Sequence, residues 1–230
     1  MPTFAELLAL AGRLSAELGR EVVVTAEVKE PSRYAADGLD VATLVLAELD
    51  RFDLDAPGSP VAVQCFEAPF LRRLRAEGLA VPLVQLVEED DQGLATCTPW
   101  GLREVSTYAE VLAPRKTLVL PVGEDGRLGP ATALVRDAHA AGLDVHVYTL
   151  RNENAFLPPA LRVPGGAGTY GRALAEHIAF LEAGVDGIFT DHPDTGVEAR
   201  RLWRAGQRSA QLPGQVRRLA DGTGPVAAVG

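Results

Sequence analysis

Apolar residues recur along the chain in two alternating patterns, one typical of amphipathic helices and one typical of buried strands. Residues 4–18 (FAELLALAGRLSAEL) place leucines on one helical stripe, and Thr3 with Glu6 forms a capping box, so the first helix is predicted here. Gly19 ends this helix, and the β-branched run at 21–29 (EVVVTAEVK) predicts the first strand. The chain therefore starts a repeat of helices and strands.

The same alternation continues over most of the chain and gives six predicted strands. Near-continuous apolar strands that alternate with helices are typical of a parallel sheet covered by helices, and the predicted class is α/β. We expect one domain over residues 1–208 and an irregular tail rich in Gly and Ala over 209–230. The remaining strands are predicted at 61–66, 82–87, about 105–112, 144–150 and 187–190, and the helices at about 39–50, 68–77, 131–141, 170–183 and 194–206.

Two architectures accommodate six parallel strands: an open doubly wound sheet, or part of an eight-stranded barrel. No G-x-G-x-x-G follows the first strand, and no G-x-x-x-x-G-K-[ST] occurs in the chain. A nucleotide-binding open sheet therefore loses its usual support, although periodicity alone leaves both architectures open.

Composition and charge narrow the class of function. With 47% hydrophobic and 23% charged residues the chain has the composition of a folded globular domain, and its net charge of -9 disfavours binding to nucleic acids. No run approaches the roughly 18 apolar residues of a membrane span, so no span is expected, and the chain taken alone predicts a cytoplasmic product. Cys65 and Cys97 lie in apolar stretches without metal-ligand spacing and are expected to be buried thiols.

The first strand carries the most informative chemistry. Thr25, Glu27 and Lys29 alternate onto one face, so a carboxylate and an ammonium group leave the strand together. Inward-facing groups near the C-terminal end of a barrel strand line the active site. A Glu at that place suits a hard cation such as Mg²⁺ or Ca²⁺, and a simple internal ion pair is the alternative.

Five segments, in order along the chain, resemble one enzyme family, the glycerophosphodiester phosphodiesterases. The family's patterns I-P-T-x-x-E-x-L, E-x-K, Q-S-F-E, V-x-x-W/Y-T-x-R/N and G-V-D-G-I-x-T-D-x-P-D are matched in that order, with Cys65 where the family has Ser. The resemblance implies a metal-dependent TIM (β/α)8-type barrel, incomplete here with about six of eight parallel strands. The matching segments are 1–8 (MPTFAELL), 26–29 (AEVK), 63–67 (VQCFE), 145–154 (VHVYTLRNEN) and 184–194 (GVDGIFTDHPD).

The resemblance also implies roles for single residues. Glu27 would bind a divalent metal, Mg²⁺ or Ca²⁺, and Lys29 would be a cation for the phosphate. Phe66 and Tyr148 would line the glycerol or headgroup side of the pocket. Lys116 falls near the lysine of the family's D-G-I-x-P-x-K, from which the surrounding residues depart. The implied reaction is hydrolysis of a small glycerophosphodiester to an alcohol and glycerol 3-phosphate, with no oligomeric state or headgroup implied.

The family's acid/base histidines, in H-R-G and H-D motifs, and its E-x-D carboxylates lie upstream of I-P-T, and this sequence contains neither H-R-G nor H-D. No catalytic residue is therefore assigned. His139 and His177 are expected to be surface or half-buried helix residues, and His192 stands beside a strand end. Of two E-x-D strings, 48–50 lies on a helix and 88–90 is expected to be a solvated acidic turn.

We therefore expect a truncated coding sequence and a nearly inactive chain, since the acid/base pair alone is worth roughly 10²-fold or more. Two alternatives remain open. One is a degenerate, non-catalytic barrel that binds a phosphorylated ligand or a partner through Glu27 and Lys29. The other is one half of a split enzyme whose missing strands come from another polypeptide.

Overall fold

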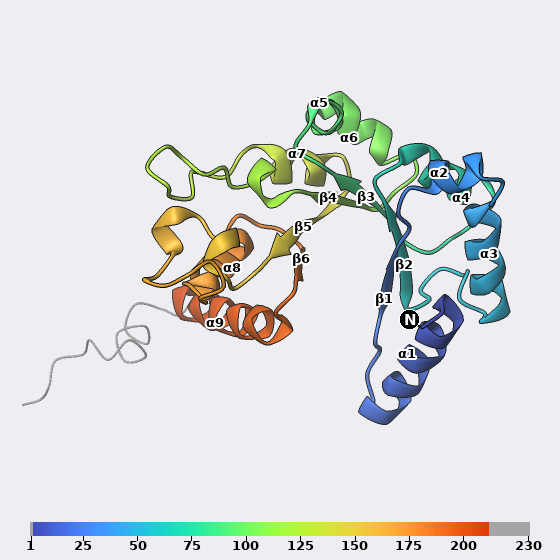
Figure 1. Cartoon of the computed structure of the whole chain (residues 1–230), viewed down its shortest axis with the longest axis horizontal. Coiled ribbons are helices and arrows are strands. Elements are labelled where there is room, and N and C mark those ends of the chain that lie inside the picture. Colours follow the sequence, from blue (N-terminus) through green and yellow to red (C-terminus); the bar gives the residue numbers. More distant parts are fainter. Residues whose placement is uncertain (1, 212–230) are drawn as a thin grey trace, which may run out of the picture. The chain divides into compact units, whose positions relative to one another are not determined.

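A computed structural model describes residues 2–211, and its six strands form one sheet (Figure 1). The strand order in the sheet is the order along the chain, and the pairs from β1 to β5 are parallel. Sequential order is that of a barrel, whereas a doubly wound sheet reverses direction at a switch point, so the prediction of a TIM-barrel type with six strands is confirmed. The strands are β1 Val24–Glu27, β2 Val61–Cys65, β3 Leu83–Val87, β4 Val111–Pro114, β5 Asp144–Leu150 and β6 Gly187–Thr190.

Helices connect the strands, as the periodicity predicts. Three short helices after β1 and β3 (α2, α5 and α6) and three 3-10 turns were not predicted. The helices are α1 Phe4–Leu18, α2 Pro31–Ala36, α3 Val41–Arg51, α4 Ala68–Ala76, α5 Asp91–Thr96, α6 Pro99–Val105, α7 Leu134–Ala140, α8 Ala173–Glu182 and α9 Pro193–Gln211, and the 3-10 turns are η1 Lys116–Leu118, η2 Asn154–Phe156 and η3 Pro159–Leu161.

Local chemistry fixes α1 at its predicted bounds. The Thr3 hydroxyl accepts from the Glu6 N–H at 3.2 Å, and the Glu6 carboxylate accepts from the Thr3 N–H at 2.7 Å, which completes the capping box. Gly19 ends the helix with φ 61°, a left-handed conformation that glycine adopts without a steric penalty. β1 is shorter than predicted, because its ladder with β2 runs only from Val24 to Glu27.

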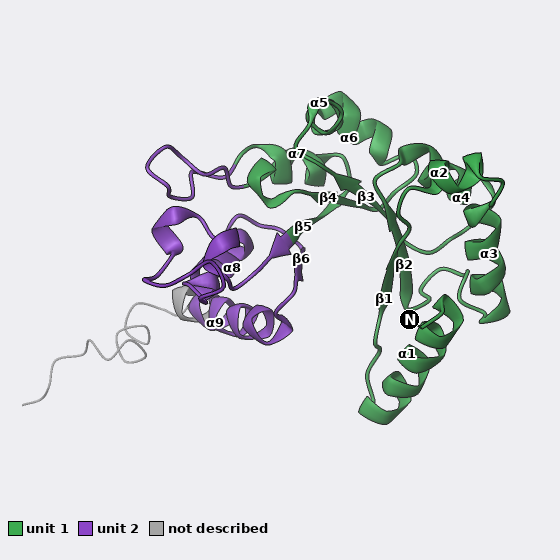
Figure 2. Cartoon of the chain, viewed as in Figure 1, with its two compact units in different colours: residues 1–119, 132–148 green, residues 120–131, 149–230 purple. Residues whose placement is uncertain are grey.

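The chain divides into two compact units (Figure 2). The first consists of residues 1–119 and 132–148, and the second of residues 120–131 and 149–230. α9 extends through Gln211, past the end predicted for it, and the rest of the predicted tail, 212–230, lies outside the described residues. Within residues 2–211 no helix is both long and apolar enough to cross a bilayer.

The core of the first unit is built on its central strands. Every residue of β2, β3 and β4 is buried, whereas β1 alternates between buried and accessible positions because it pairs only with β2 among the described strands. Leu71 and Leu74 of α4 are fully buried. This rigid sheet holds the residues that follow its strand ends.

In the second unit the core contains a histidine. The prediction that His177 is a surface or half-buried residue is wrong, because the side chain is fully buried beside Phe180 of the same helix. Its Nδ1 lies 2.9 Å from the Ala173 carbonyl oxygen, and its Nε2 lies 3.3 Å from the Thr190 hydroxyl. A buried imidazole with both nitrogens bonded is a satisfied core residue.

Candidate active site

The strand ends of the first unit bring five polar or aromatic side chains to one edge of the sheet. Glu27 ends β1, and Phe66, Glu88 and Arg115 directly follow β2, β3 and β4. Tyr148 of β5 forms a parallel bridge with Arg115. Because the carboxyl ends of parallel strands share an edge, these residues form the candidate site of this unit.

Glu27 is the last residue of β1, and Lys29 lies two positions beyond the strand with its ammonium group beside the Glu27 carboxylate. The Lys29 Nζ lies 3.7 Å from a Glu27 carboxylate oxygen, and 29% of the Glu27 side chain is exposed. An accessible ion pair of this length contributes at most about 1 kcal/mol to stability. Both groups can therefore exchange this contact for a ligand at small cost.

Phe66 and Tyr148, both predicted to line the substrate pocket, lie together. Their ring centroids are 5.9 Å apart with an interplanar angle of 88°, an edge-to-face contact. The Tyr148 hydroxyl donates to the Val87 carbonyl at 2.8 Å, which fixes the ring over the end of β3. The exposed ring of Phe66 gives the site an apolar wall.

Arg115 is a cation of this site that the sequence reasoning missed. Lys116, the residue assigned by resemblance, opens the 3-10 turn η1 one position further along the chain. The Arg115 guanidinium donates to Glu88 at 2.8 Å. The strand was predicted too early, at about 105–112, whereas β4 is Val111–Pro114, so Arg115 was not expected directly after a strand end.

The acidic stretch after β3 is the accessible turn expected from the sequence, but its first and last side chains have partners. Glu88 is bound by Arg115, and Asp90 caps α5 by accepting from the Gly93 N–H at 2.7 Å. Burial by itself would raise the pKa of Glu88, but the hydrogen bond from Arg115 outweighs it and holds the pKa below its ordinary value. Glu88 is therefore an anion of the site over a wide pH range.

This pair makes a testable prediction. In Arg115→Gln the burial of Glu88 remains while its cation is gone, so we expect the pKa of Glu88 to rise. A depressed carboxyl pKa adds stability above the unfolded-state pKa of about 4.3 and loses it as the pH falls through the folded-state value. The variant should thus be less stable than the wild type at pH 7, with the difference shrinking on acidification.

Carbon-detected NMR titration of the Glu88 carboxyl group, beside urea unfolding at several pH values, measures both effects. Arg33→Gln is a matched control, because Arg33 pairs with Glu30 on α2 and not with Glu88. A Glu88 pKa that is equal in Arg115→Gln and the wild type would contradict the assignment.

The donors beside β1 fit a hard cation in kind but not in number. Gln64 of β2 is in register with Glu27, is 8% exposed, and has a buried amide oxygen without a hydrogen-bond partner in the described part of the chain. A carboxylate and an amide oxygen are ligands that Mg²⁺ and Ca²⁺ accept, but these ions take six or more. Across residues 2–211 no group of three or more His, Cys, Asp or Glu side chains could hold a metal ion.

The second unit gathers its own charged residues at the ends of β5 and β6. The Arg151 Nε lies 2.6 Å from an Asp191 carboxylate oxygen. His192, which the sequence placed beside a strand end, lies with its Nε2 3.2 Å from Glu153, and its ring makes an edge contact with Tyr170 at 5.1 Å. The Glu153 carboxylate and the Tyr170 ring together orient the His192 imidazole.

The two cysteines carry no reactive thiol. Cys65 is buried and Cys97 is half-buried, and both are free. Burial raises the pKa of each thiol to about 11, so both stay protonated at neutral pH.

Known proteins resemble the chain over most of its length. Residues 1–195 match the model of the glycerophosphoryl diester phosphodiesterase family. A glycerophosphodiester phosphodiesterase of Treponema pallidum is 28% identical over 85% of the chain, and one of Haemophilus influenzae is 27% identical over 85%. The chain covers 58% and 57% of these relatives, so it spans little more than half their length.

The fold is similar to that of a solved structure, a glycerophosphodiester phosphodiesterase from Parabacteroides distasonis. The TM-score is 0.56 at 16% sequence identity, over 90% of this chain and 65% of the other. At this sequence identity the similarity concerns the arrangement of strands and helices alone.

Proposed function

Because the chain belongs to the glycerophosphoryl diester phosphodiesterase family, we propose that it provides the substrate-binding part of a glycerophosphodiester hydrolase. The observation that carries the proposal is the meeting of Glu27, Lys29, Phe66 and Tyr148 at the strand ends of one compact unit. The proposed reaction turns a glycerophosphodiester into an alcohol and glycerol 3-phosphate.

Different side chains are proposed to bind different parts of the substrate, cations the phosphate and aromatic rings the alcohol. In this proposal the Lys29 ammonium group pairs with the phosphate, and Arg115, at the end of β4 and already balanced by Glu88, is a second cation of the site. Local cations are needed, because a chain with a net charge of -9 repels a diester anion. The edge of Tyr148 and the exposed ring of Phe66 form the apolar wall for the alcohol part.

Glu27 is the proposed ligand of a divalent metal, Mg²⁺ or Ca²⁺. When bound, such an ion neutralises charge on the phosphate oxygens. Since the described residues supply too few donors, the remaining ligands must come from outside this set. Glu27 then has two tasks, to hold Lys29 in place and to offer one oxygen to the metal.

Hydrolysis at phosphorus forms one P–O bond to the attacking oxygen and breaks another, with the electron pair leaving on the alcohol oxygen. A base must take the proton of the nucleophile, and an acid must protonate the departing alcohol. The family's motifs for these proton transfers, H-R-G and H-D, do not occur in this sequence. We therefore propose that the chain as it stands binds substrate but turns it over very slowly.

A direct comparison tests the proposal. We expect the purified chain to hydrolyse glycerophosphodiesters with Mg²⁺ or Ca²⁺ at least about 10²-fold more slowly than a form extended upstream in its reading frame. Release of glycerol 3-phosphate is measured with a coupled enzyme assay. Equal turnover by the two forms would contradict the account, whereas two inactive forms that still bind glycerol 3-phosphate would support a non-catalytic binding barrel.

A further inference from the structure

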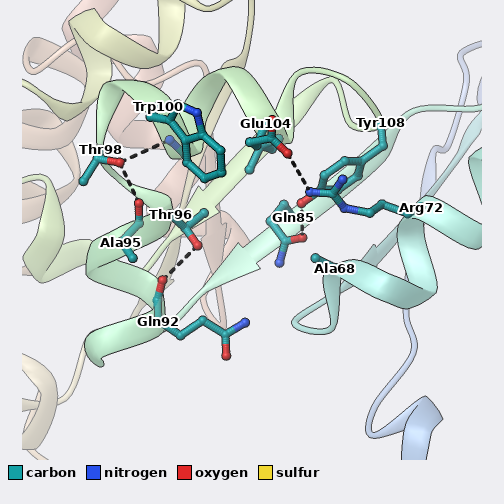
Figure 3. A pocket seen from close by; sticks show the side chains of 12 residues that line it. Ala68, Arg72, Gln85, Gln92, Ala95, Thr96, Thr98, Trp100, Glu104 and Tyr108 are labelled. Atoms are coloured by element: carbon teal, nitrogen blue, oxygen red, sulfur yellow. Dashed lines mark hydrogen bonds and ion pairs between the residues drawn. The ribbon is translucent and has the colours of Figure 1, made fainter.

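A second pocket lies in the first unit, between α4, α5 and α6, and takes no part in the site described above (Figure 3). Its volume is about 400 Å³, within the range of small-molecule sites. Four side chains give it its character: Arg72 from α4, Trp100 and Glu104 from α6, and Tyr108 just after α6. These are a cation, an anion and two aromatic rings.

The two charges of the pocket face each other loosely. The Arg72 guanidinium lies 3.4 Å from a Glu104 carboxylate oxygen, and the side chains are 48% and 40% exposed. The same guanidinium lies 4.6 Å above the centre of the Tyr108 ring. A long, accessible ion pair of this kind is weak, so a ligand can open it at little cost.

Trp100 provides an uncovered aromatic surface beside these charges. It is 66% exposed, and it precedes Glu104 by four positions on α6, so the two side chains share one face of the helix. Figure 3 shows the indole and the carboxylate on the same wall, with Arg72 opposite. An exposed indole in a pocket is suited to stack on the apolar part of a ligand.

We propose that this pocket binds a small zwitterion of the amino-acid class. Its carboxylate pairs with Arg72, its ammonium group pairs with Glu104, and its apolar side chain stacks on Trp100. The balance of charge selects this class, because a cation would compete with Arg72 for Glu104, and an anion would leave Glu104 without its partner. Only a ligand with both charges compensates both sides.

Two consecutive hydrogen bonds connect this pocket to the candidate active site. The Tyr108 hydroxyl donates to the Gln85 side-chain oxygen at 2.8 Å, and the Gln85 amide donates to the Phe66 carbonyl at 2.9 Å. Arg72, the proposed carboxylate partner, covers the Tyr108 ring at the start of this chain. The binding itself does not depend on the proposed function.

Isothermal titration calorimetry of the chain with L-phenylalanine, L-leucine and L-methionine tests the proposal. We expect saturable binding of at least one of them, and binding roughly tenfold weaker or less for its methyl ester, which is only a cation, and its N-acetyl derivative, which is only an anion. Absence of saturable binding by all three amino acids, or equally tight binding of a singly charged derivative, overturns it.

Variants locate the site. Arg72→Gln and Glu104→Gln should each weaken binding roughly tenfold or more. Arg103→Gln, an exposed neighbour on α6 outside the pocket lining, should bind as the wild type does. Thermal melting by circular dichroism confirms that each variant is folded, and unchanged affinity in folded Arg72→Gln or Glu104→Gln would overturn the assignment.

Discussion

Glu27→Gln is expected to lower kcat/KM by about 10²-fold or more in the form extended upstream that the proposed function calls for. The substitution keeps the shape of the side chain and removes its charge. It therefore weakens a metal ligand and also removes the counter-ion that lies 3.7 Å from the Lys29 ammonium group. Initial rates measured against substrate and against Mg²⁺ or Ca²⁺ should show a higher metal concentration at half-maximal rate.

Glu30→Gln is the matched control for this variant. Glu30 lies three positions further along the chain, pairs with Arg33 at 3.1 Å, and belongs to the start of α2 rather than to the strand end. We expect its kcat/KM to stay within about threefold of the wild type, since it loses only an exposed ion pair. Equal activity of Glu27→Gln and Glu30→Gln would exclude Glu27 from metal binding.

Leu71→Ala is expected to lower the free energy of unfolding by about 2 to 5 kcal/mol. Leu71 of α4 is fully buried, so the substitution removes apolar contacts and leaves a cavity that the rigid sheet cannot close. Leu44→Ala on α3, where the leucine is 50% exposed, should cost much less. Urea unfolding followed by circular dichroism measures both, and equal losses would show that α4 does not seal this core.

The elements that were predicted correctly are those whose signals are local. α1 has its capping box and its stop at Gly19, and β5 alternates between apolar and polar residues over its first part, 144–148. The missed helices α5 and α6 are six and seven residues long, too short for a periodic pattern. Each begins at a single N-cap residue, Asp90 for α5 and Thr98 for α6, and such residues are equally common in loops.

In the candidate site, too, the features that depend on local sequence were predicted, and those that depend on packing were not. The nearness of Glu27 and Lys29 agrees with the alternation predicted for this segment, although only Glu27 lies in β1. The contact between Glu88 and Arg115 joins residues 27 positions apart, and it depends on the register of β3 with β4, which no local pattern encodes. Burial of His177 likewise depends on what packs around α8, so its amphipathic pattern suggested a more exposed place.

The hydrogen bond between Tyr108 and Gln85 restricts which substitutions these two positions can accept during evolution. Gln85 is buried, and its amide group also bonds to the Phe66 and Leu86 carbonyls, so its side-chain oxygen depends on the Tyr108 hydroxyl. A change of either residue alone strands a buried polar group, whereas a joint change to apolar residues need not. Descendants of this chain should therefore inherit positions 85 and 108 as a pair.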